Sequence, residues 1–539
     1  MKLFLLSLLM LLFFSINDSP AQLGNKNMYL LKNLNQHYTP TLYAAVWGYK
    51  ANDGREYAIM GCPTGTAFVD ITNPADIHEV SFLTGPTSSW REMKTYSHYA
   101  YIVSEAFNSG IQIVDLQYLP DSIHFVKQFV PLSHTSTHSI SQSGPYLYLN
   151  GCNPSFVPNQ GIAILDLSAD AVTPVLRGKW TGFYVHDCRI VNDTIYTANI
   201  FDQNVSIIDA RNKDLPVTIT TFVNLPGSGP HNTALTADGN RLFVTDEIGT
   251  APYLLKVWNI EDFKNITYVT SWQPTGITAS IVHNIEIYGN YAHVAHYTAG
   301  VRILNIQNPD VPVEEAWYDT YPLNDGTSYN GCWGVYMFPS GKIIASDRNT
   351  GLYILKTTFN ISLAIEGYYN SSSDRLNKTD TVRAYLRNAS APYIIVDSSS
   401  AVVDSVTLTG NFKFSNAPNG TYYIALKHRS CIEVWSKAGG ESYDPMTIQS
   451  YDFTNSDSKA FGNNIVQVDA SPVRFALYSG DINFDGVVNL NDVIATSNDF
   501  ALFVTGYVNT DLSGDNIVNL TDIIIGQNNA VKFIVKIIP

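Results

Sequence analysis

The sequence predicts a mainly β protein in three parts: a seven-bladed β-propeller, then a β-sandwich, and finally a small α-helical module with two calcium-binding loops. Three observations lead to this prediction. The 539-residue chain is rich in Tyr, Val, Ile, Thr, Gly and Asn, and only 15% of its residues are charged, a composition typical of strands. A short apolar segment recurs along the first two-thirds of the chain, and two similar acidic loops stand near its end.

The N-terminal segment is typical of a signal peptide. Lys2 supplies a positive charge, residues 3–16 form an apolar stretch too short to span a bilayer, and Ser19-Pro20-Ala21 provides small residues for cleavage. We therefore assign residues 1–21 to a signal peptide and expect a secreted protein, extracellular or associated with the cell surface, without a membrane span. The net charge of −15 argues against a nucleic-acid partner, because the phosphate backbone recruits Lys and Arg.

The recurring segment is a short apolar strand that usually ends in Asp or Asn. Its seven copies lie roughly 43 to 51 residues apart, which is the size of a four-stranded propeller blade. The copies are Ala67–Asp70, Ile111–Asp115, Ile162–Asp166, Val205–Asp209, Leu255–Asn259, Val301–Asn305 and Gly351–Leu355.

Each copy belongs to a larger unit with a constant order. Two strands joined by a polar turn come before it, and Asn-Pro with an outer strand often follows it. No outer strand follows the last copy, so the early strand Met28–Leu31 is expected to take that place and close the ring without an open edge. The prediction is a seven-bladed propeller over residues 22–357, with a solenoid as the alternative.

The repeated Ile-Val-Asp strand resembles the LVIVD repeat. The propeller region as a whole resembles the secreted choice-of-anchor B family, in which a β-propeller is joined to varied C-terminal anchoring modules. The resemblance implies an architecture and an attachment role for the C-terminal part. It implies no particular chemistry, because the activity of that family is poorly defined.

The middle segment, residues 358–475, has a different pattern. Five strands are predicted there: Ser362–Tyr369, Thr381–Leu386, Ala401–Leu408, Asn411–Phe414 and Thr421–Lys427. The turn Ala417–Gly420 followed by the last of these strands resembles the edge of transthyretin-like or carboxypeptidase-regulatory-like β-sandwiches. No catalytic constellation is visible, so the segment is interpreted as a spacer or accessory sandwich.

Residues 476–539 contain two loops with the spacing of a calcium site. A hard cation requires several oxygen ligands at close range and a sharp turn between them. In the first loop the candidate ligands are Asp481, Asn483, Asp485, the carbonyl of Val487, Asn489 and Asp492. In the second they are Asp511, Ser513, Asp515, the carbonyl of Ile517, Asn519 and Asp522.

The two loops differ at the turn position. Gly486 allows a left-handed conformation in the first loop, and Asn516 replaces it in the second, where Asn also tolerates that conformation. Because Ser513 is a weaker ligand than an amide or a carboxylate, we expect the second site to be weaker. An apolar helical stretch follows each loop.

Two loop-helix units in tandem at a chain end resemble a type I dockerin. The resemblance implies calcium binding and attachment to a cohesin-like or cell-surface protein. Dockerins often carry hydroxyl groups at loop positions 10 and 11, where this chain has Leu490, Asn491, Leu520 and Thr521. The alternative is that calcium only stabilises the module.

Aligning the first strands of the blades predicts a ring of side chains in the central channel. Blades three to six place His138, His186, His231 and His283 at about the same position, and blades one, two and seven place Trp47, Trp90 and Trp333 there. Further candidates follow the second strands and are expected near the same mouth: Glu105, Glu247, His293, His296 and Asp347.

Gathered imidazoles support several kinds of chemistry. They bind transition metals or anions, and they serve as acid–base groups. They also fill channels and form hydrogen bonds with neighbouring strands, without any chemical role. The favoured hypothesis is a secreted, non-catalytic propeller that binds an unknown small molecule, glycan or protein. The alternative is an extracellular enzyme, metal-dependent or hydrolytic and related to polysaccharides, that uses the histidine-lined channel.

Overall fold

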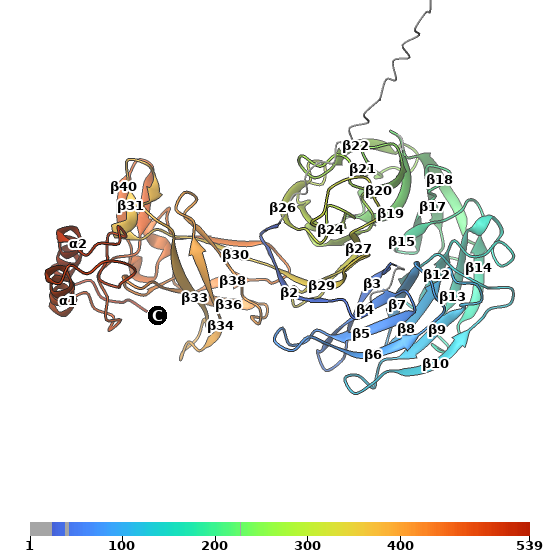
Figure 1. The fold of residues 1–539 in the computed structure, drawn as a ribbon. Coiled ribbons are helices and arrows are strands. Elements are labelled where there is room, and N and C mark those ends of the chain that lie inside the picture. The colour runs from blue at the N-terminus through green and yellow to red at the C-terminus, as the bar shows by residue number, and fades with distance from the viewer. Residues whose placement is uncertain (1–23, 38–41, 227) are drawn as a thin grey trace, which may run out of the picture.

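The computed structural model describes residues 24–37, 42–226 and 228–539. The predicted signal peptide, residues 1–21, lies outside the described residues. Three parts follow one another along the molecule in chain order: a ring of sheets, a smaller β region and a pair of helices at the far end (Figure 1). No helix of the described residues is long and apolar enough to cross a membrane.

The ring consists of seven sheets within the described part of residues 25–357, six with four strands and one with five. The strands of each sheet are given from the first strand outward. The first sheet contains β3 (Val46–Lys50), β4 (Glu56–Cys62), β5 (Gly65–Asp70) and β6 (His78–Thr84), and the second contains β7 (Arg91–Tyr96), β8 (Tyr99–Ser104), β9 (Ile111–Asp115) and β10 (His124–Phe129). The third contains β11 (Ser139–Ser143), β12 (Tyr146–Asn150), β13 (Ile162–Asp166) and β14 (Val175–Trp180), and the fourth contains β15 (Asp187–Val191), β16 (Thr194–Ala198), β17 (Asn204–Asp209) and β18 (Val217–Val223).

The other three sheets follow the same order. They are β19 (Ser228–Leu235), β20 (Arg241–Gly249), β21 (Leu255–Asn259) and β22 (Thr267–Trp272); β23 (Ile285–Tyr288), β24 (Tyr291–Ala295), β25 (Val301–Asn305), β26 (Val313–Tyr318) and the short β1 (Asn25–Lys26); and β27 (Cys332–Met337), β28 (Ile343–Asp347), β29 (Gly351–Thr357) and β2 (Met28–Leu34).

The first strands of these sheets contact one another in a closed ring. The contacts run from β3 through β7, β11, β15, β19, β23 and β27 back to β3. This arrangement of mostly four-stranded sheets fits a β-propeller. β2 pairs antiparallel with β29, from Met28 opposite Thr357 to Leu34 opposite Leu352. The strand expected at Met28–Leu31 therefore completes the last sheet, so that the ring is fastened by both ends of its chain segment.

The polar residue that ends the recurring segment has a structural role. Asp70 Oδ1 accepts a hydrogen bond from the backbone N–H of Thr72 at 2.8 Å. The same bond, to the N–H two positions later, is made by Asp115, Asp166, Asp209, Asn259 and Asn305. The side chain turns the backbone out of the third strand of each sheet, which explains why the repeat reads as apolar residues followed by Asp or Asn.

The third strands are apolar because neighbouring sheets cover both of their faces. In β13, Ile162, Ile164 and Leu165 are 0% exposed, whereas the outer strand β18 is mostly exposed. Burying a side chain of this size completely contributes ~1.5–3 kcal/mol. The repeat therefore records the layer of each sheet that stabilises the ring most.

The middle part has two main sheets around one core. One sheet has the order β35 (Thr409–Phe412), β30 (Phe359–Ser362), β39 (Gln449–Asp452), and the other has β34 (Ile395–Val403), β33 (Asp380–Asn388), β36 (Gly420–Lys427), β37 (Val434–Trp435), with β38 (Glu441–Tyr443) also paired to β36. Two hairpins flank them, β31 (Tyr369–Asn370) with β32 (Arg375–Leu376) and β40 (Val466–Ala470) with β41 (Val473–Ala476). Ile361 and Ile424, from different sheets, lie in the same buried core.

Two predicted strands of this part are wrong in position. Most of Ser362–Tyr369 lies beyond β30, and Glu366–Tyr368 is a 3-10 turn. Most of Ala401–Leu408 is a turn after β34, fixed by Asp404, whose Oδ1 accepts hydrogen bonds from the N–H groups of Val406 and Thr407. The alternating apolar residues that looked like a strand therefore belong to a turn that an aspartate holds in place.

The C-terminal part contains helices α1 (Leu490–Ala501) and α2 (Leu520–Ala530). Asn489 caps α1, and Asp492 completes a capping box with it. Asn519 and Asp522 do the same for α2. Each helix therefore begins where its predicted calcium loop ends, and the last loop residue also fixes the first helical turn.

Candidate functional site at one mouth of the ring

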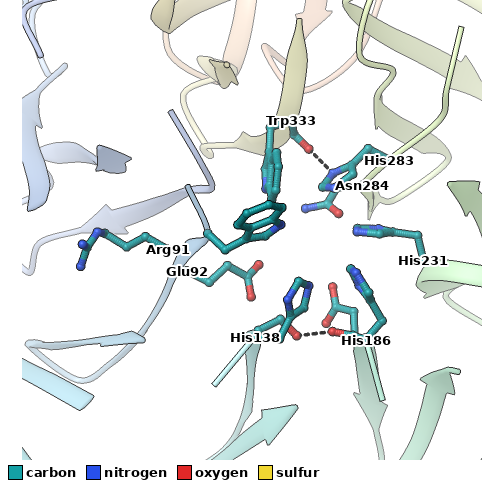
Figure 2. Close-up of a pocket in the computed structure, with 11 residues that line it drawn as sticks. Arg91, Glu92, His138, His186, His231, His283, Asn284 and Trp333 are labelled. Atoms are coloured by element: carbon teal, nitrogen blue, oxygen red, sulfur yellow. Dashed lines mark hydrogen bonds between the residues drawn. The ribbon is translucent and has the colours of Figure 1, made fainter. Parts of the chain in front are cut away.

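Four histidines meet where the first strands of four neighbouring sheets begin. Their ring centroids are 4.0 Å apart for His138 and His186, 4.4 Å for His186 and His231, and 3.8 Å for His231 and His283. All four point toward the centre of the ring (Figure 2), and none is more than 8% exposed. The register read from the repeat does bring these four side chains together.

Two of the three predicted tryptophans continue this arc. The ring of Trp333 lies 4.5 Å from that of His283 and 6.4 Å from that of Trp90. The arc lines a cavity of about 20 Å³, which has room for a single water or ion.

The third tryptophan, Trp47, is not in the arc, and its predicted place is wrong. Tyr49 of β3 and Ser143 of β11 hold equivalent positions in their sheets. Each pairs with a residue of the second strand, and that residue pairs with the aspartate that ends the repeat in the third strand. His138 stands five residues before Ser143, but Trp47 only two before Tyr49. Trp47 therefore lies further along the channel, where Lys94 Nζ is 3.8 Å from its ring.

Glu247 is the carboxylate around which three of the histidines gather. Its Oε2 lies 3.6 Å from His231 Nε2 and 3.9 Å from His186 Nε2, and its Oε1 lies 3.6 Å from His283 Nε2. The hydroxyl of Tyr297 donates a hydrogen bond to Oε1 at 2.7 Å. Among the described residues, one group of three His, Cys, Asp or Glu side chains has all its ligand atoms within 4.8 Å of one another, and it is His186, His231 and Glu247.

The three imidazoles near Glu247 are neutral at neutral pH. Burial lowers the pKa of His186 and His283 well below 6.5, and that of His231 below the same value. His283 Nδ1 lies 2.6 Å from the carbonyl of Trp333. Because a carbonyl only accepts, this nitrogen carries the proton and Nε2 carries the lone pair. That Nε2 is buried without a hydrogen-bond partner.

His138 is different from the other three. Its Nδ1 lies 2.5 Å from Glu105 Oε1. Burial opposes its charged form, but the hydrogen bond and the charge of Glu105 raise the pKa of His138 above 6.5. The arc therefore combines an imidazole of raised pKa, paired with a carboxylate, and imidazoles of lowered pKa beside it, which suits proton transfer as well as binding.

A larger cavity of about 420 Å³ opens beside the arc. Sequence reasoning identified several of its lining residues but missed Tyr184, Phe201, Tyr329 and Arg348. The guanidinium of Arg348 lies 4.5 Å from the centre of the Trp333 ring. These four residues lie outside the strands of the repeat and share no repeat position, so no periodic signal marks them.

Three other candidates do not line either cavity of this mouth. His293 lies in β24 with its ring 5.3 Å from that of Tyr288. The side chain of His296 pairs with Ser280 Oγ at 3.0 Å. Asp347 accepts hydrogen bonds from the backbone N–H groups of the turn that follows it. These side chains serve the local structure of their own sheets.

The first predicted calcium loop surrounds a buried carboxylate. Asp481 is 2% exposed, its Oδ2 accepts a hydrogen bond from the N–H of Gly486 at 3.2 Å, and its Oδ1 has no partner. Burial raises the pKa of Asp481 to about 6, and the charges of Asp492 and Asp485 raise it as well. A buried carboxylate oxygen without a partner, beside other carboxylates, fits a cation site.

The remaining residues of the first loop hold its shape. Asn483 Oδ1 accepts from the N–H of Asp485, and Asp485 Oδ1 accepts from the N–H of Val487, both at 2.9 Å. Asn489 uses its Oδ1 to cap α1, by accepting from the N–H of Asn491 at 2.8 Å.

The second loop repeats this arrangement with one addition. Asp511 and Asp522 are 0% exposed, and Ser513 Oγ is buried without a partner. Asn516 has φ of 67°, the left-handed conformation expected for it in place of glycine. Asp515 Oδ1 accepts from the N–H of Ile517 at 2.8 Å. The second loop also retains the acidic positions of the first.

The addition is a contact with the middle part of the chain. The guanidinium of Arg429 lies 3.4 Å from Asp511 Oδ2 and donates from Nε to Asp380 Oδ2 at 3.1 Å. Asp380 Oδ1 accepts from the hydroxyl of Tyr507 at 2.6 Å. The second loop is therefore attached to the sheet that contains β33, and no equivalent arginine lies against the first loop among the ion pairs of the described residues.

Exposed apolar residues repeat across the two helical units. Leu490 and Leu520 are 67% and 59% exposed, and Ile494 and Ile524 are 48% and 47% exposed. Each pair occupies the same position in its unit. The two helical units therefore expose large apolar side chains at matching positions.

Comparisons with known proteins identify one repeat and several distant structural likenesses. Residues 280–320, which include β23 to β26, match the LVIVD repeat. No curated protein matches the chain. A proposed 6-phosphogluconolactonase from Bacteroides uniformis is 11% identical with a TM-score of 0.44, covering 55% of this chain and 88% of that one. A periplasmic gluconolactonase from Pseudomonas aeruginosa, PpgL, is 11% identical with a TM-score of 0.41, covering 54% and 88%. The LVIVD match, together with the ring of sheets, supports a repeat β-propeller.

Proposed function

We propose that this is a secreted protein whose seven-bladed β-propeller binds a small molecule or glycan at the mouth described above, and whose C-terminal module attaches it to a partner. One observation carries the binding role: a cavity of about 420 Å³ walled by aromatic rings, with the charged Arg348, Glu105 and Glu247 at its sides. A volume of several hundred Å³ suits a small ligand. Phe201 and Tyr329 are 67% and 48% exposed, so their faces are free for a planar or apolar part of that ligand.

The test is a thermal-shift screen of the mature chain against oligosaccharides and small carboxylic acids. We expect at least one compound to stabilise the wild type and to lose that effect in a Phe201→Ala/Tyr329→Ala double variant. Phe125→Ala is the matched control, because Phe125 is 43% exposed on the outer strand β10 and far from the cavity in the sheet. Equal stabilisation of the double variant and the control would place the ligand elsewhere.

The C-terminal module is proposed to be a calcium-stabilised, dockerin-like attachment unit, as in the choice-of-anchor B architecture. The buried, unpartnered Asp481 Oδ1 supports a cation in the first loop, and the buried Ser513 Oγ supports one in the second. Bound calcium would supply the positive charge that the clustered carboxylates need. We expect calcium titration of the full chain to stabilise the module, and Asp481→Ala with Asp511→Ala to abolish that response. An unchanged titration would show that the loops are not the sites.

Attachment is proposed to use the repeated apolar pairs of α1 and α2. Leu490 and Leu520 replace the hydroxyl-bearing residues of typical dockerins, so the contact surface of the partner would be apolar. The partner would resemble a cohesin only in the part of the module that it contacts. A Leu490→Ser/Leu520→Ser variant is expected to lose partner binding while it keeps calcium binding. Pull-down from culture supernatant and cell-surface extracts, followed by direct binding of the purified partner, measures this.

A second candidate function is catalysis at the same mouth. The observation that favours it is the close His138–Glu105 pair, which raises the pKa of His138, beside His186, whose pKa burial lowers, and Glu247. A proton donor next to a carboxylate and neutral imidazoles can serve hydrolysis. Turnover of any compound that binds in the screen, and its loss in His138→Gln, would favour an extracellular enzyme over a binding protein.

A further inference from the structure

We infer that the floor of the propeller mouth is a site for a divalent transition metal, Zn²⁺ by preference, held by His186, His231 and Glu247. The inference rests on the proposed function, because the ligand of the propeller mouth is what would reach the metal. It differs from the ring expected from the sequence in two ways. Glu247 joins the set, and His138 and His283 leave it.

The first argument is the spacing of the donor atoms. Hydrogen bonds from ring N–H groups to carboxylates have lengths of about 2.7–3.2 Å. The three Nε2 atoms lie 3.6, 3.6 and 3.9 Å from the nearest Glu247 oxygen, so the carboxylate makes no such bond with any of them. Ligand atoms at 2.0–2.2 Å from a tetrahedral metal are separated from one another by roughly 3.3–3.6 Å. The distance from Glu247 Oε2 to His231 Nε2 falls at the end of this range, and the distance to His186 Nε2 slightly exceeds it. The ligand atoms of His186, His231 and Glu247 all lie within 4.8 Å of one another, so one ion between them would be within reach of all three.

The second argument is the state of the donors. The imidazoles of His186 and His231 are buried, and each turns its Nε2 toward Glu247 Oε2. Imidazole nitrogens and one carboxylate are the ligands that Zn²⁺ takes in catalytic and binding sites.

The third argument is the set of groups behind the donors. The Tyr297 hydroxyl donates to Glu247 Oε1 and leaves Oε2 toward His186 and His231. The carbonyl of Trp333 accepts from Nδ1 of the neighbouring His283, as Figure 2 shows, and Nε2 of that histidine lies 3.6 Å from Glu247 Oε1. Hydrogen bonds of this kind orient metal ligands and select their tautomer. His138 has a different arrangement, because its Nδ1 is paired with Glu105 Oε1 at 2.5 Å and it does not belong to the group of converging ligand atoms.

The fourth argument is access from the mouth. His186 and His231 line the cavity of about 20 Å³, whereas His186 and Glu247 line the larger cavity of about 420 Å³. The three side chains therefore stand where the two cavities adjoin, and the larger one brings a ligand to them. A small molecule with a carboxylate or hydroxyl oxygen could therefore bind the metal while Arg348 contacts its anionic group.

The test is metal content and the spectrum of bound Co²⁺ in the full mature chain, prepared without a histidine tag. Chelator-treated protein is given Ca²⁺ and then Co²⁺ or Zn²⁺, and loosely bound ions are removed. We expect stoichiometric retention of Zn²⁺ and the visible absorption of four-coordinate Co²⁺. Glu247→Gln, which preserves side-chain size, and His231→Ala should each weaken retention roughly tenfold or more.

Two controls separate this site from the rest of the chain. His124→Ala removes an exposed histidine on β10 and should retain the metal and the spectrum. Asp481→Ala/Asp511→Ala alters the calcium loops and should leave the Co²⁺ spectrum unchanged. Circular dichroism melts confirm that the Glu247 and His231 variants are folded.

Two results would overturn the inference: wild-type protein that retains no Zn²⁺ or Co²⁺, or retention that Glu247→Gln and His231→Ala leave unchanged. Failure here is distinguishable from failure of the proposed function. A metal-free wild type whose ligand binding still depends on Phe201 and Tyr329 would keep the binding site and remove the metal. A wild type that retains the metal, but whose ligand binding does not depend on Phe201 and Tyr329, would keep the metal site and remove the proposed ligand-binding site.

Discussion

At the scale of single residues, the site depends on which nitrogen of each histidine is free. The Nδ1 of His283 donates to a backbone carbonyl and its Nε2 has no hydrogen-bond partner, while the Nδ1 of His138 is paired with a carboxylate that raises the pKa of this histidine. Two histidines at equivalent positions of the repeat thus have opposite chemistry. The difference comes from the partner outside the repeat and not from the histidine itself.

Tyr297 is expected to act as a positioning residue for Glu247. Tyr297→Phe removes the hydrogen bond to Oε1 and should lower Zn²⁺ affinity by about 10–100-fold, because the carboxylate loses its fixed orientation. A competition titration with a chromophoric chelator measures this. The control is Tyr101→Phe, which removes another buried tyrosine hydroxyl, bonded at 2.8 Å to the carbonyl of Ala171. An equal loss of affinity in both variants would assign the effect to stability alone.

Sequence reasoning could predict part of this site. The repeat sets the four histidines in register because equivalent strand positions face the same axis. It misplaced Trp47, because the offset of β3 against its partner is visible only in the pairing of the strands. Glu247 was one of five candidates, and nothing in its spacing marked it as the central one. Phe201 and Arg348 lie outside the repeat strands, where periodicity carries no information.

At the scale of elements, the two loop-helix units are equal in sequence pattern but different in surroundings. The first loop contributes the apolar Val488 to the core of the middle part, whereas the second has a charged contact, with Arg429 against Asp511. That arginine also binds Asp380, which holds the hydroxyl of Tyr507. The sequence pattern predicts both loops but not this difference, because Arg429 and Asp380 lie in a segment with no detectable relation to the loops.

Asp380 is expected to stabilise the junction in a pH-dependent way. Burial alone would raise the pKa of Asp380, but hydrogen bonds from His428 and Tyr507 hold it well below 3.8. A depressed folded-state pKa gives stability that is present above about pH 4 and lost as the pH falls toward the folded-state value. We expect Asp380→Asn to lower the free energy of unfolding by about 3 kcal/mol near pH 7, with a smaller difference at low pH.

Urea unfolding at several pH values measures the Asp380 effect, and limited proteolysis reports whether the module separates from the sheets. Asp404→Asn serves as the control, because Asp404 lies in an exposed turn of the same part. A pH-independent loss in Asp380→Asn would show that the charge of the carboxylate is not what stabilises the junction.

At the scale of the whole molecule, the ring is closed by a strand from the other end of its own segment. β2 contributes Met28 and Tyr29, which are 1% and 5% exposed, to the last sheet. The missing outer strand after the last repeat made this closure predictable. The arrangement of the ring against the middle part was not predictable, because it depends on single contacts such as Lys356 Nζ with the carbonyls of Phe414 and Ser415.

Removal of β2 should open the ring. Deleting residues 22–34 exposes the edge of β29 and the apolar surface under Met28, at a cost of at least ~3 kcal/mol, and an exposed strand edge favours association between chains. We expect a lower melting temperature and oligomers in size-exclusion chromatography with light scattering. Deletion of residues 22–24, before β1, is the control. A monomeric protein with an unchanged melting temperature would mean that β2 is not required for closure.

The pairing of β2 with β29 also sets an order of events during biosynthesis. The chain is made from its N-terminus, so the strand that ends at Leu34 emerges long before its partner, which begins at Gly351. Its edge must stay unpaired while six sheets form, and contacts between such distant residues are slow to make. The last step of assembling the ring is therefore the return of its earliest strand, and any factor that shields residues 28–34 until then would act at that step.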